Sequence, residues 1–218
     1  MPAGGYPSPN FGERRDGARP DLIVLHYTAM PTCAEARERL CDPSVEVSAH
    51  WLIAEDGTVE QLVDEAMRAW HAGAGAWDGV SDVNSRSIGI ELANTGDAPF
   101  PEPQMAALER LLPAIMARWD ISAARVIAHS DMAPERKRDP GPRFDWRRLA
   151  LQRLALWPEG EGDNTTPLLA SLAALGYPDA APEALLQAFR LRFRPWAEGD
   201  ETAEDRAVAD GVVRTSQA

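Results

Sequence analysis

The sequence has few cysteines and no long apolar run. Among its 218 residues are two cysteines, Cys33 and Cys41, both within one expected helix. At about 1.5 Å of rise per residue they lie roughly 12 Å apart, which is too far for a disulfide. Neither has the close cysteine or histidine neighbours of a zinc finger. No stretch approaches the roughly 20 apolar residues of a membrane-spanning helix, so we expect no integral membrane segment.

Basic side chains are also fewer than acidic ones. The 34 Asp and Glu against 22 Lys and Arg give a net charge of −12, which opposes binding to nucleic acid or to an anionic membrane surface. The first twenty residues read as an irregular arm and lack both a secretory signal and a lipid-attachment cysteine. We therefore expect a cytoplasmic protein, or a periplasmic one if a leader has been removed.

Strand-like and helical patterns alternate as far as Trp157, which predicts an α/β domain over residues 1–157 with a mixed central β-sheet flanked by helices. A capping box of Thr32 and Glu35 opens the first helix. Residues 72–86 read as a long surface loop. The expected strands cover 22–25, 50–54, 58–63, 87–93 and 125–128, and the expected helices cover 32–40, 102–119 (with Pro113 as a kink or local misfit) and 146–156.

A polar, glycine-bearing stretch at 158–164 resembles a linker between domains. Beyond it, helical patterns at 167–175, 182–193 and 202–213 predict a small all-α C-terminal domain over residues 158–218. About sixty residues is near the lower limit for independent folding, so this domain leans on the first. Arg190, Arg192 and Arg194 alternate with apolar residues, and we interpret them as a solvated face.

Two histidines follow directly on expected strands and suggest a metal site. His26 follows the strand at 22–25, His129 follows the strand at 125–128, and Asp139 lies in a turn ten residues after His129. Side chains at strand ends commonly form the sites of α/β folds, and two histidines with one carboxylate are a ligand set of catalytic zinc. Spacing alone leaves two alternatives open, namely ordinary hydrogen-bonded histidines and Asp131 as the carboxylate.

Six strings occur in order over about residues 20–157. They are LHYTA at 25–29, VSAH at 47–50, WHAG at 70–73, SIGIEL at 87–92, AHSDMAP at 128–134 and RKRDPG at 136–141. Through these strings the chain resembles the zinc-dependent N-acetylmuramoyl-L-alanine amidases of the type-2 family, which includes AmiD-like and AmpD-like enzymes. Through residues 168–177 and 188–195 the tail is more weakly similar to the helical peptidoglycan-binding-type domain of AmiD-like members.

The resemblance implies a role for each matching residue. His26, His129 and Asp139 become the ligands of a zinc cofactor, and Asp131 becomes a non-ligand tied to nearby backbone. His50 is interpreted as mainly structural. The resemblance also implies Glu91 as catalytic acid/base, Lys137 as the cation that stabilises the oxyanion, and substrate contacts for His71 and Asn84.

The resemblance thereby implies a bacterial hydrolase of cell-wall turnover or muropeptide recycling. We expect a monomer, although no feature of the sequence specifies the oligomeric state. Its substrate would be the amide between the lactyl group of N-acetylmuramic acid and L-alanine, in peptidoglycan or muropeptides that include 1,6-anhydro forms. Two other hypotheses stay open, a peptidoglycan-recognition module without catalysis and a zinc hydrolase of another amide. A cytoplasmic enzyme would act on recycled fragments, whereas the helical tail is typical of enzymes that meet larger wall material.

Overall fold

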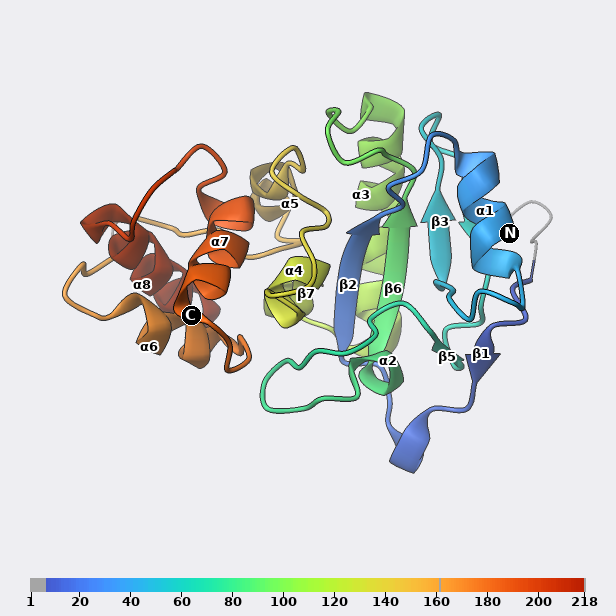
Figure 1. Cartoon of the computed structure of the whole chain (residues 1–218), viewed down its shortest axis with the longest axis horizontal. Helices are drawn as coiled ribbons and strands as arrows, with labels where there is room; N and C mark the ends of the chain where they lie inside the picture. The colour runs from blue at the N-terminus through green and yellow to red at the C-terminus, as the bar shows by residue number, and fades with distance from the viewer. Residues whose placement is uncertain (1–6, 161, 218) are drawn as a thin grey trace.

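The core of the fold is one mixed β-sheet (Figure 1). The computed structural model describes residues 7–160 and 162–217, so the first six residues of the expected N-terminal arm lie outside the described part. Four strands of the sheet run parallel, and β4 pairs antiparallel with β3 at one edge. In spatial order the strands are β4 (Val59–Gln61), β3 (Trp51–Ile53), β6 (Ser87–Leu92), β2 (Leu22–Tyr27) and β7 (Val126–Ala128).

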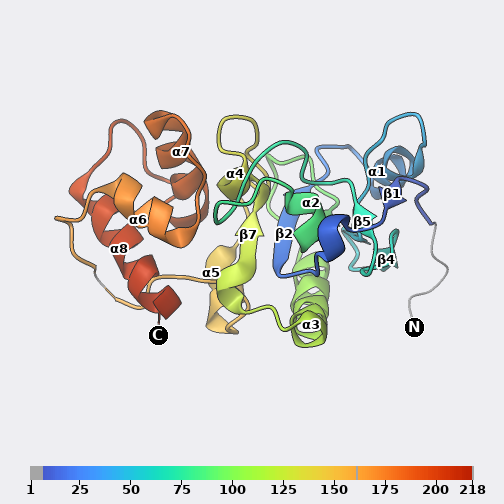
Figure 2. The same cartoon turned by 90° about the horizontal axis from the view of Figure 1, so that it is seen from below.

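Short elements and helices surround this sheet, which confirms the predicted α/β class. In Figures 1 and 2, α3 lies along one face of the sheet, and α6, α7 and α8 lie together beyond β7. β1 (Phe11–Gly12) pairs with β5 (Arg68–Ala69), and 3-10 turns span Arg15–Gly17 and Ala123–Arg125. The α-helices are α1 (Cys33–Cys41), α2 (Val83–Arg86), α3 (Glu102–Trp119), α4 (His129–Met132), α5 (Trp146–Leu151), α6 (Leu168–Leu175), α7 (Pro182–Phe193) and α8 (Ala203–Gln217).

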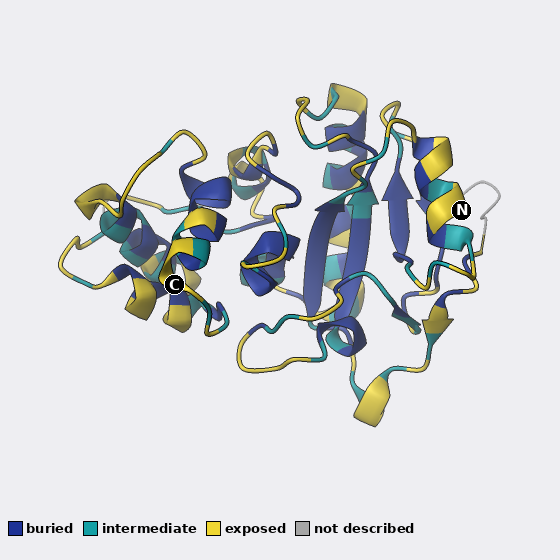
Figure 3. Ribbon diagram, in the orientation of Figure 1, coloured by how far each residue is buried: buried dark blue, intermediate teal, exposed yellow. Residues whose placement is uncertain are grey.

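Alternation along the two central strands gives the sheet one apolar face and one functional face. In β6, Ile88, Ile90 and Leu92 pack with the buried side chains of α3, whereas Ser87, Gly89 and Glu91 point to the opposite face. Figure 3 shows both central strands buried along almost their whole length. Because β2 and β6 pair in parallel with His26 opposite Glu91, these two residues project from the same face.

The helices follow the capping and periodicity rules closely. Thr32 caps α1 by accepting a hydrogen bond from the backbone of Glu35. The continuous helix α3 includes Pro113, which lies on its exposed side. Cys33 and Cys41 lie at opposite ends of α1 and are not joined by a disulfide. None of the described helices combines the length and apolar character that crossing a bilayer requires.

Helices α6, α7 and α8, which we call the C-terminal helical unit, share an apolar core with the sheet. Leu22, Val24 and Ile127 of the strands belong to the same buried cluster as Leu172 and Phe189 of the unit. Removal of this apolar area from water holds the unit against β7. The division into domains at residues 157 and 158 stays a prediction. The shared core shows that the C-terminal helical unit packs against the sheet.

Several sequence-based expectations were wrong in detail. Helix α5 ends at Leu151 and not at 156, α8 continues to Gln217, and the expected loop at 72–86 ends in the short helix α2. The arginines that we interpreted as a solvated face are instead buried, with exposed fractions of 7% for Arg190 and 5% for Arg192 and Arg194. Each is neutralised by a carboxylate that is distant in sequence or lies on another helix, Asp131 or Asp205.

Candidate metal centre and catalytic cleft

Strand ends bring the predicted metal ligands together. His26 is the fifth residue of β2, and His129 directly follows β7, the strand beside it. The carboxyl ends of parallel strands meet at one edge of the sheet, where sites of α/β folds commonly lie. Asp139 comes from the loop after α4 and is anchored there because its carbonyl accepts a hydrogen bond from the Ser130 amide at 3.0 Å. All three side chains are buried, with exposed fractions of 1%, 3% and 7%.

The donor atoms of these residues are spaced as a metal ion requires. Nδ1 of His26 lies 2.9 Å from Nδ1 of His129, and each nitrogen lies 3.0 Å from Oδ2 of Asp139. Ligand atoms of a tetrahedral zinc site stand about 3.3 Å apart, given metal–ligand bonds of about 2.0–2.1 Å. Within the described residues, this is the one group of three or more metal-ligating side chains that could hold an ion.

The second nitrogen of each imidazole also has a partner. Nε2 of His129 donates to the carbonyl of Ala72 at 2.8 Å, so its Nδ1 is left with a lone pair that faces the cluster. Nε2 of His26 lies 3.0 Å from Nδ1 of His71. Burial, followed by the nearby His129, lowers the pKa of His26 to about 4. Burial and the neighbouring His129 thus both favour the neutral form of the His26 imidazole, which is the form that binds metals.

His71 therefore supports a ligand of the cluster. If Nδ1 of His26 faces the metal, its Nε2–H donates to Nδ1 of His71, and His71 carries its own proton on Nε2. That nitrogen lies 3.1 Å from Oγ of Ser87, whose hydroxyl donates to the carbonyl of Val83 at 2.6 Å. Burial and the neighbouring histidines lower the pKa of His71 well below its usual value, which keeps this ring neutral.

Gly89 makes room for this arrangement. A Cβ atom at position 89 would lie 2.4 Å from the ring of His71, closer than any real Cβ contact. The glycine of the SIGIEL string thus lets the imidazole of His71 pack directly against β6. From the other side, Oδ1 of Asn84 accepts hydrogen bonds from the backbone amides of His71 and Ala72, at 3.0 and 2.9 Å. Asn84 is buried, so the contact that we can assign to it is with this loop, and its predicted contact with substrate stays a prediction.

Glu91 presents an unpaired carboxylate next to the cluster. Its Oε2 is buried and has no hydrogen-bond partner within the described residues. Burial raises the pKa of Glu91 to about 8, and the charge of Asp139 adds to that rise while Lys137 opposes it. A carboxyl group with a pKa near neutrality exchanges protons readily, as a general acid/base must.

A cavity of about 420 Å³ contains these groups. Lys137 lines it, and its ammonium has no hydrogen bond or ion pair with any residue that the structure describes. An unpaired cation beside the cluster is placed to meet a negative charge that develops there. The other chemically active side chains of the wall are His26, His71, Glu91, His129 and Asp139, and Tyr27 and Trp70 supply aromatic surface.

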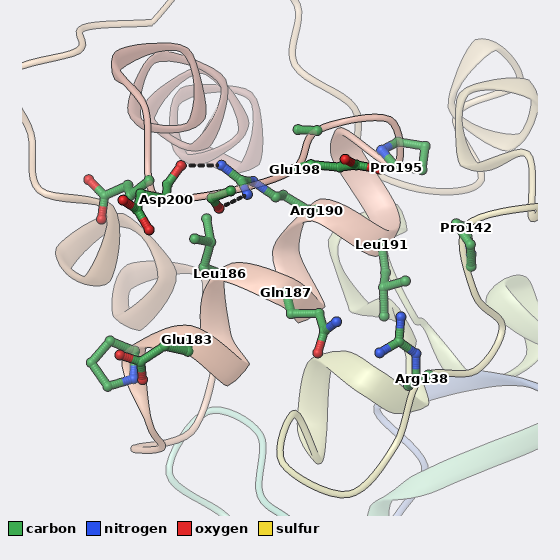
Figure 4. A pocket seen from close by; sticks show the side chains of 14 residues that line it. Arg138, Pro142, Glu183, Leu186, Gln187, Arg190, Leu191, Pro195, Glu198 and Asp200 are labelled. Carbon is green, nitrogen blue, oxygen red and sulfur yellow. Dashed lines mark hydrogen bonds between the residues drawn. The ribbon is translucent and has the colours of Figure 1, made fainter.

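A larger hollow of about 720 Å³ lies along α7 and contains none of the metal-cluster residues (Figure 4). Its rim is fixed by Arg190, which donates to the carbonyls of Gly199 and Asp200. In Figure 4, Arg138 extends from the loop before Asp139 toward Gln187 and Leu191. Arg138 lines both cavities, but all the candidate acids, bases and ligands line the smaller one, which is therefore the candidate catalytic cleft.

The remaining histidine and the competing carboxylate lie outside the cluster. His50 is fully buried, accepts a hydrogen bond from the Gly89 amide at 2.9 Å and lies 3.1 Å from the Met67 carbonyl. Burial lowers its pKa to about 3, so it is a neutral structural residue. Asp131 points away from the cluster: its Oδ2 accepts a hydrogen bond from the Ala128 amide at 2.9 Å.

Two arginines support this region through contacts that the sequence did not predict. Arg136 donates to the carbonyl of Ala72 at 2.7 Å, the same oxygen that accepts the hydrogen bond from His129. Arg14, in the arm that we expected to be irregular, donates to the carbonyls of Glu65 and Ser85 at 2.7 and 2.9 Å. Both bind main-chain oxygens of residues distant in sequence, a kind of contact that no local pattern encodes.

Comparison with known proteins gives consistent matches. The family model described as N-acetylmuramoyl-L-alanine amidase matches residues 16–142. The chain is 36% identical to the N-acetylmuramoyl-L-alanine amidase AmiD of Escherichia coli K12, over 88% of this chain and 82% of the relative. It is 35% identical to the 1,6-anhydro-N-acetylmuramyl-L-alanine amidase AmpD of Citrobacter freundii, over 66% of this chain and 86% of the relative.

A solved structure extends the likeness to the whole fold. The E. coli AmiD complex with anhydro-N-acetylmuramic acid-L-Ala-D-γ-Glu-L-Lys matches with a TM-score of 0.81 at 34% identity. The match covers 94% of this chain and 98% of that chain, so it includes the C-terminal helical unit as well as the sheet.

We expect His71→Phe to weaken metal binding at this cluster by roughly 10- to 100-fold, because His26 loses the acceptor for its Nε2–H and with it a fixed ring orientation. Chelator competition with added zinc on the purified full chain measures this affinity. Tyr27→Phe, which removes a hydroxyl from the same cavity wall, is the control and should bind the added metal as the unaltered chain does. Equal affinity in the His71 variant would contradict the supporting role.

Proposed function

The chain belongs to the family of N-acetylmuramoyl-L-alanine amidases, and from this membership we propose the reaction of its cleft. It hydrolyses the amide that joins the lactyl group of N-acetylmuramic acid to L-alanine, in peptidoglycan or in muropeptides that include 1,6-anhydro forms. The observation that carries this proposal is the convergence of His26, His129 and Asp139 in a cavity that also contains Glu91 and Lys137.

Zinc is the metal that the cluster fits best. Two imidazole nitrogens and one carboxylate oxygen, about 3 Å from one another, are a donor set of catalytic zinc and leave a further position toward the cavity. His26, His129 and Asp139 would hold the ion. When bound, zinc would polarise the scissile carbonyl and lower the pKa of a coordinated water to about 7.

Glu91 moves the proton in this scheme. Its carboxylate takes a proton from the attacking water and later delivers that proton to the nitrogen of L-alanine as the C–N bond breaks. The amine then leaves neutral, and the lactyl group becomes a carboxylic acid. The buried, unpaired Oε2 and the raised pKa of Glu91 suit a group that must accept and return a proton within one turnover.

Lys137 meets the charge that develops on the carbonyl oxygen. As water adds to the carbonyl carbon, that oxygen becomes negative, and a nearby cation in a partly buried cavity stabilises the transition state more than the ground state. Lys137 precedes Asp139 by two residues, so one short loop supplies both a metal ligand and this cation.

The biological setting follows from the substrate class. Amidases of this specificity release stem peptides, so the proposed role is in cell-wall turnover or muropeptide recycling, with peptidoglycan fragments as partners. The cytoplasmic location, the monomeric state and the binding of wall material by the C-terminal helical unit stay predictions of the sequence.

We expect Glu91→Gln to lower kcat at least about 100-fold, because the amide has nearly the shape of the carboxyl group but accepts no proton. Steady-state hydrolysis of a purified muropeptide, with circular dichroism and zinc content measured in parallel, checks this. Turnover at the original rate by a folded, zinc-loaded variant would refute the role assigned to Glu91.

Zinc content separates an enzyme from a binding module. We expect one zinc per chain by elemental analysis, loss of hydrolysis after chelation and recovery when zinc is returned. His129→Ala should lose the metal because only two ligands remain. A chain that binds muropeptides but purifies without stoichiometric zinc, and that hydrolyses nothing after zinc is added, would instead be a recognition module.

The reaction products show which amide bond the protein hydrolyses. We expect mass spectrometry of a digest to show intact stem peptides that begin with L-alanine, together with a free lactyl carboxylate on the sugar. Anhydro and reducing-end muropeptides, digested side by side, show which sugar form is preferred. Cleavage within the stem peptide would identify the zinc hydrolase of another amide and reject the proposed bond.

A further inference from the structure

Asp131 is a fully buried carboxylate immediately beside a metal ligand, and the proposed reaction does not use it. Its Oδ2 accepts a hydrogen bond from the amide of Ala128 at 2.9 Å. Ala128 ends β7, and the next residue is His129. The carboxylate therefore fixes the main chain at the point where the ligand leaves the strand. A buried charge at such a place needs partners of its own.

Both side-chain partners of Asp131 come from the C-terminal helical unit and the turn after α6. The hydroxyl of Tyr177 donates to Oδ1 at 2.6 Å, and Nη1 of Arg192 donates to Oδ2 at 2.8 Å. Tyr177 and Arg192 are buried, with exposed fractions of 7% and 5%. The charged hydrogen bond from Arg192 is thus shielded from water and from salt.

Asp131 is the one carboxylate with which Arg192 forms an ion pair among the described residues. Its Cζ lies 4.1 Å from the ring centre of Trp146, a cation–π distance, and it also lies over the ring of Phe193. Nε and Nη2 have no hydrogen-bond partner within the described residues. Arg190 and Arg194, by contrast, form their ion pairs inside the helical unit, with Asp205. Arg192 is therefore the arginine of α7 that reaches the turn of His129.

Tyr177 also touches the loop that accepts the hydrogen bond from His129. Its ring lies 5.2 Å from the ring of Trp77, and the carbonyl of Gly176 accepts a hydrogen bond from the Asp78 amide at 2.8 Å. The same loop begins at Ala72, whose carbonyl binds Nε2 of His129. The helical unit and the turn after α6 thus contact both Asp131, which holds the main chain before His129, and the loop that orients the His129 ring.

We propose that the C-terminal helical unit positions His129 through Asp131, with Tyr177 and Arg192 as positioning residues. The unit is then part of the metal centre's support and not only an appended module. This inference rests on the proposed function insofar as His129 binds zinc. Its geometric part, the placement of the imidazole, holds in the metal-free chain as well and is tested there separately.

Tyr177→Phe and Arg192→Lys, made in the full chain, test the proposal. Tyr177→Phe removes one hydroxyl without changing shape, and Arg192→Lys keeps the charge but loses the planar group over Trp146. We expect each variant to bind zinc about tenfold more weakly in chelator competition, because altered support of a ligand weakens metal affinity. Arg194→Lys is the matched control, a buried arginine of the same region whose ion pairs stay within the unit.

Thermal unfolding and imidazole NMR separate positioning from general stability. Arg194→Lys should lower the unfolding midpoint and leave zinc affinity unchanged. In the metal-free chain, Tyr177→Phe should shift the ¹⁵N imidazole resonances of His129 and leave those of His50 in place. Unchanged zinc affinity in both Asp131-facing variants, or an equal loss in Arg194→Lys, would overturn the proposal.

The proposed amidase reaction can fail independently of this inference. If the His129 resonances shift but the unaltered chain hydrolyses no muropeptide, the positioning role stands and the reaction does not. If hydrolysis is normal and neither the resonances nor zinc affinity respond to Tyr177→Phe and Arg192→Lys, the reaction stands and the positioning role is wrong.

Discussion

The parallel register of β6, β2 and β7 is the constraint on which the site depends. His26 and Glu91 are paired across β2 and β6, and β7 ends beside them where His129 begins α4. A slip of one residue in β6 would turn Glu91 toward α3 and bring Leu92 to the cleft. The apolar contacts of Ile88 and Ile90 with α3 oppose that slip. Apolar packing on one face of the sheet therefore determines which side chains of β6 face the cleft on the other.

The sequence was most informative where its signals are local. The strands with their terminal histidines, the Thr32 cap and helix α3 all follow from periodicity and short-range hydrogen bonding. The sequence was misleading for Arg190, Arg192 and Arg194, because their burial depends on Asp131 and Asp205, which no spacing rule links to them. The same holds for Arg14, whose acceptors are main-chain oxygens of distant segments.

The three proposed ligands differ in what holds them. His26 depends on another side chain, His71, whereas Nε2 of His129 binds a main-chain carbonyl that Arg136 also binds. Asp139 lies in the loop between α4 and α5. His26 is thus held by a side chain that packs on the sheet, His129 by a loop and the C-terminal helical unit, and Asp139 by a turn. These supports are linked, because Asn84 holds both His71 and Ala72 and the Ser130 amide holds Asp139. Together they keep the cluster pre-organised, which is what rapid turnover on a metal requires.

The lack of a side chain at Gly89 limits which pairs of residues positions 71 and 89 can accept. The ring of His71 occupies the space that any larger residue at position 89 would need. A larger residue at position 89 therefore fits only if the side chain at position 71 becomes smaller or moves. The reverse does not hold, because a smaller side chain at position 71 would leave space beside Gly89 and cause no clash.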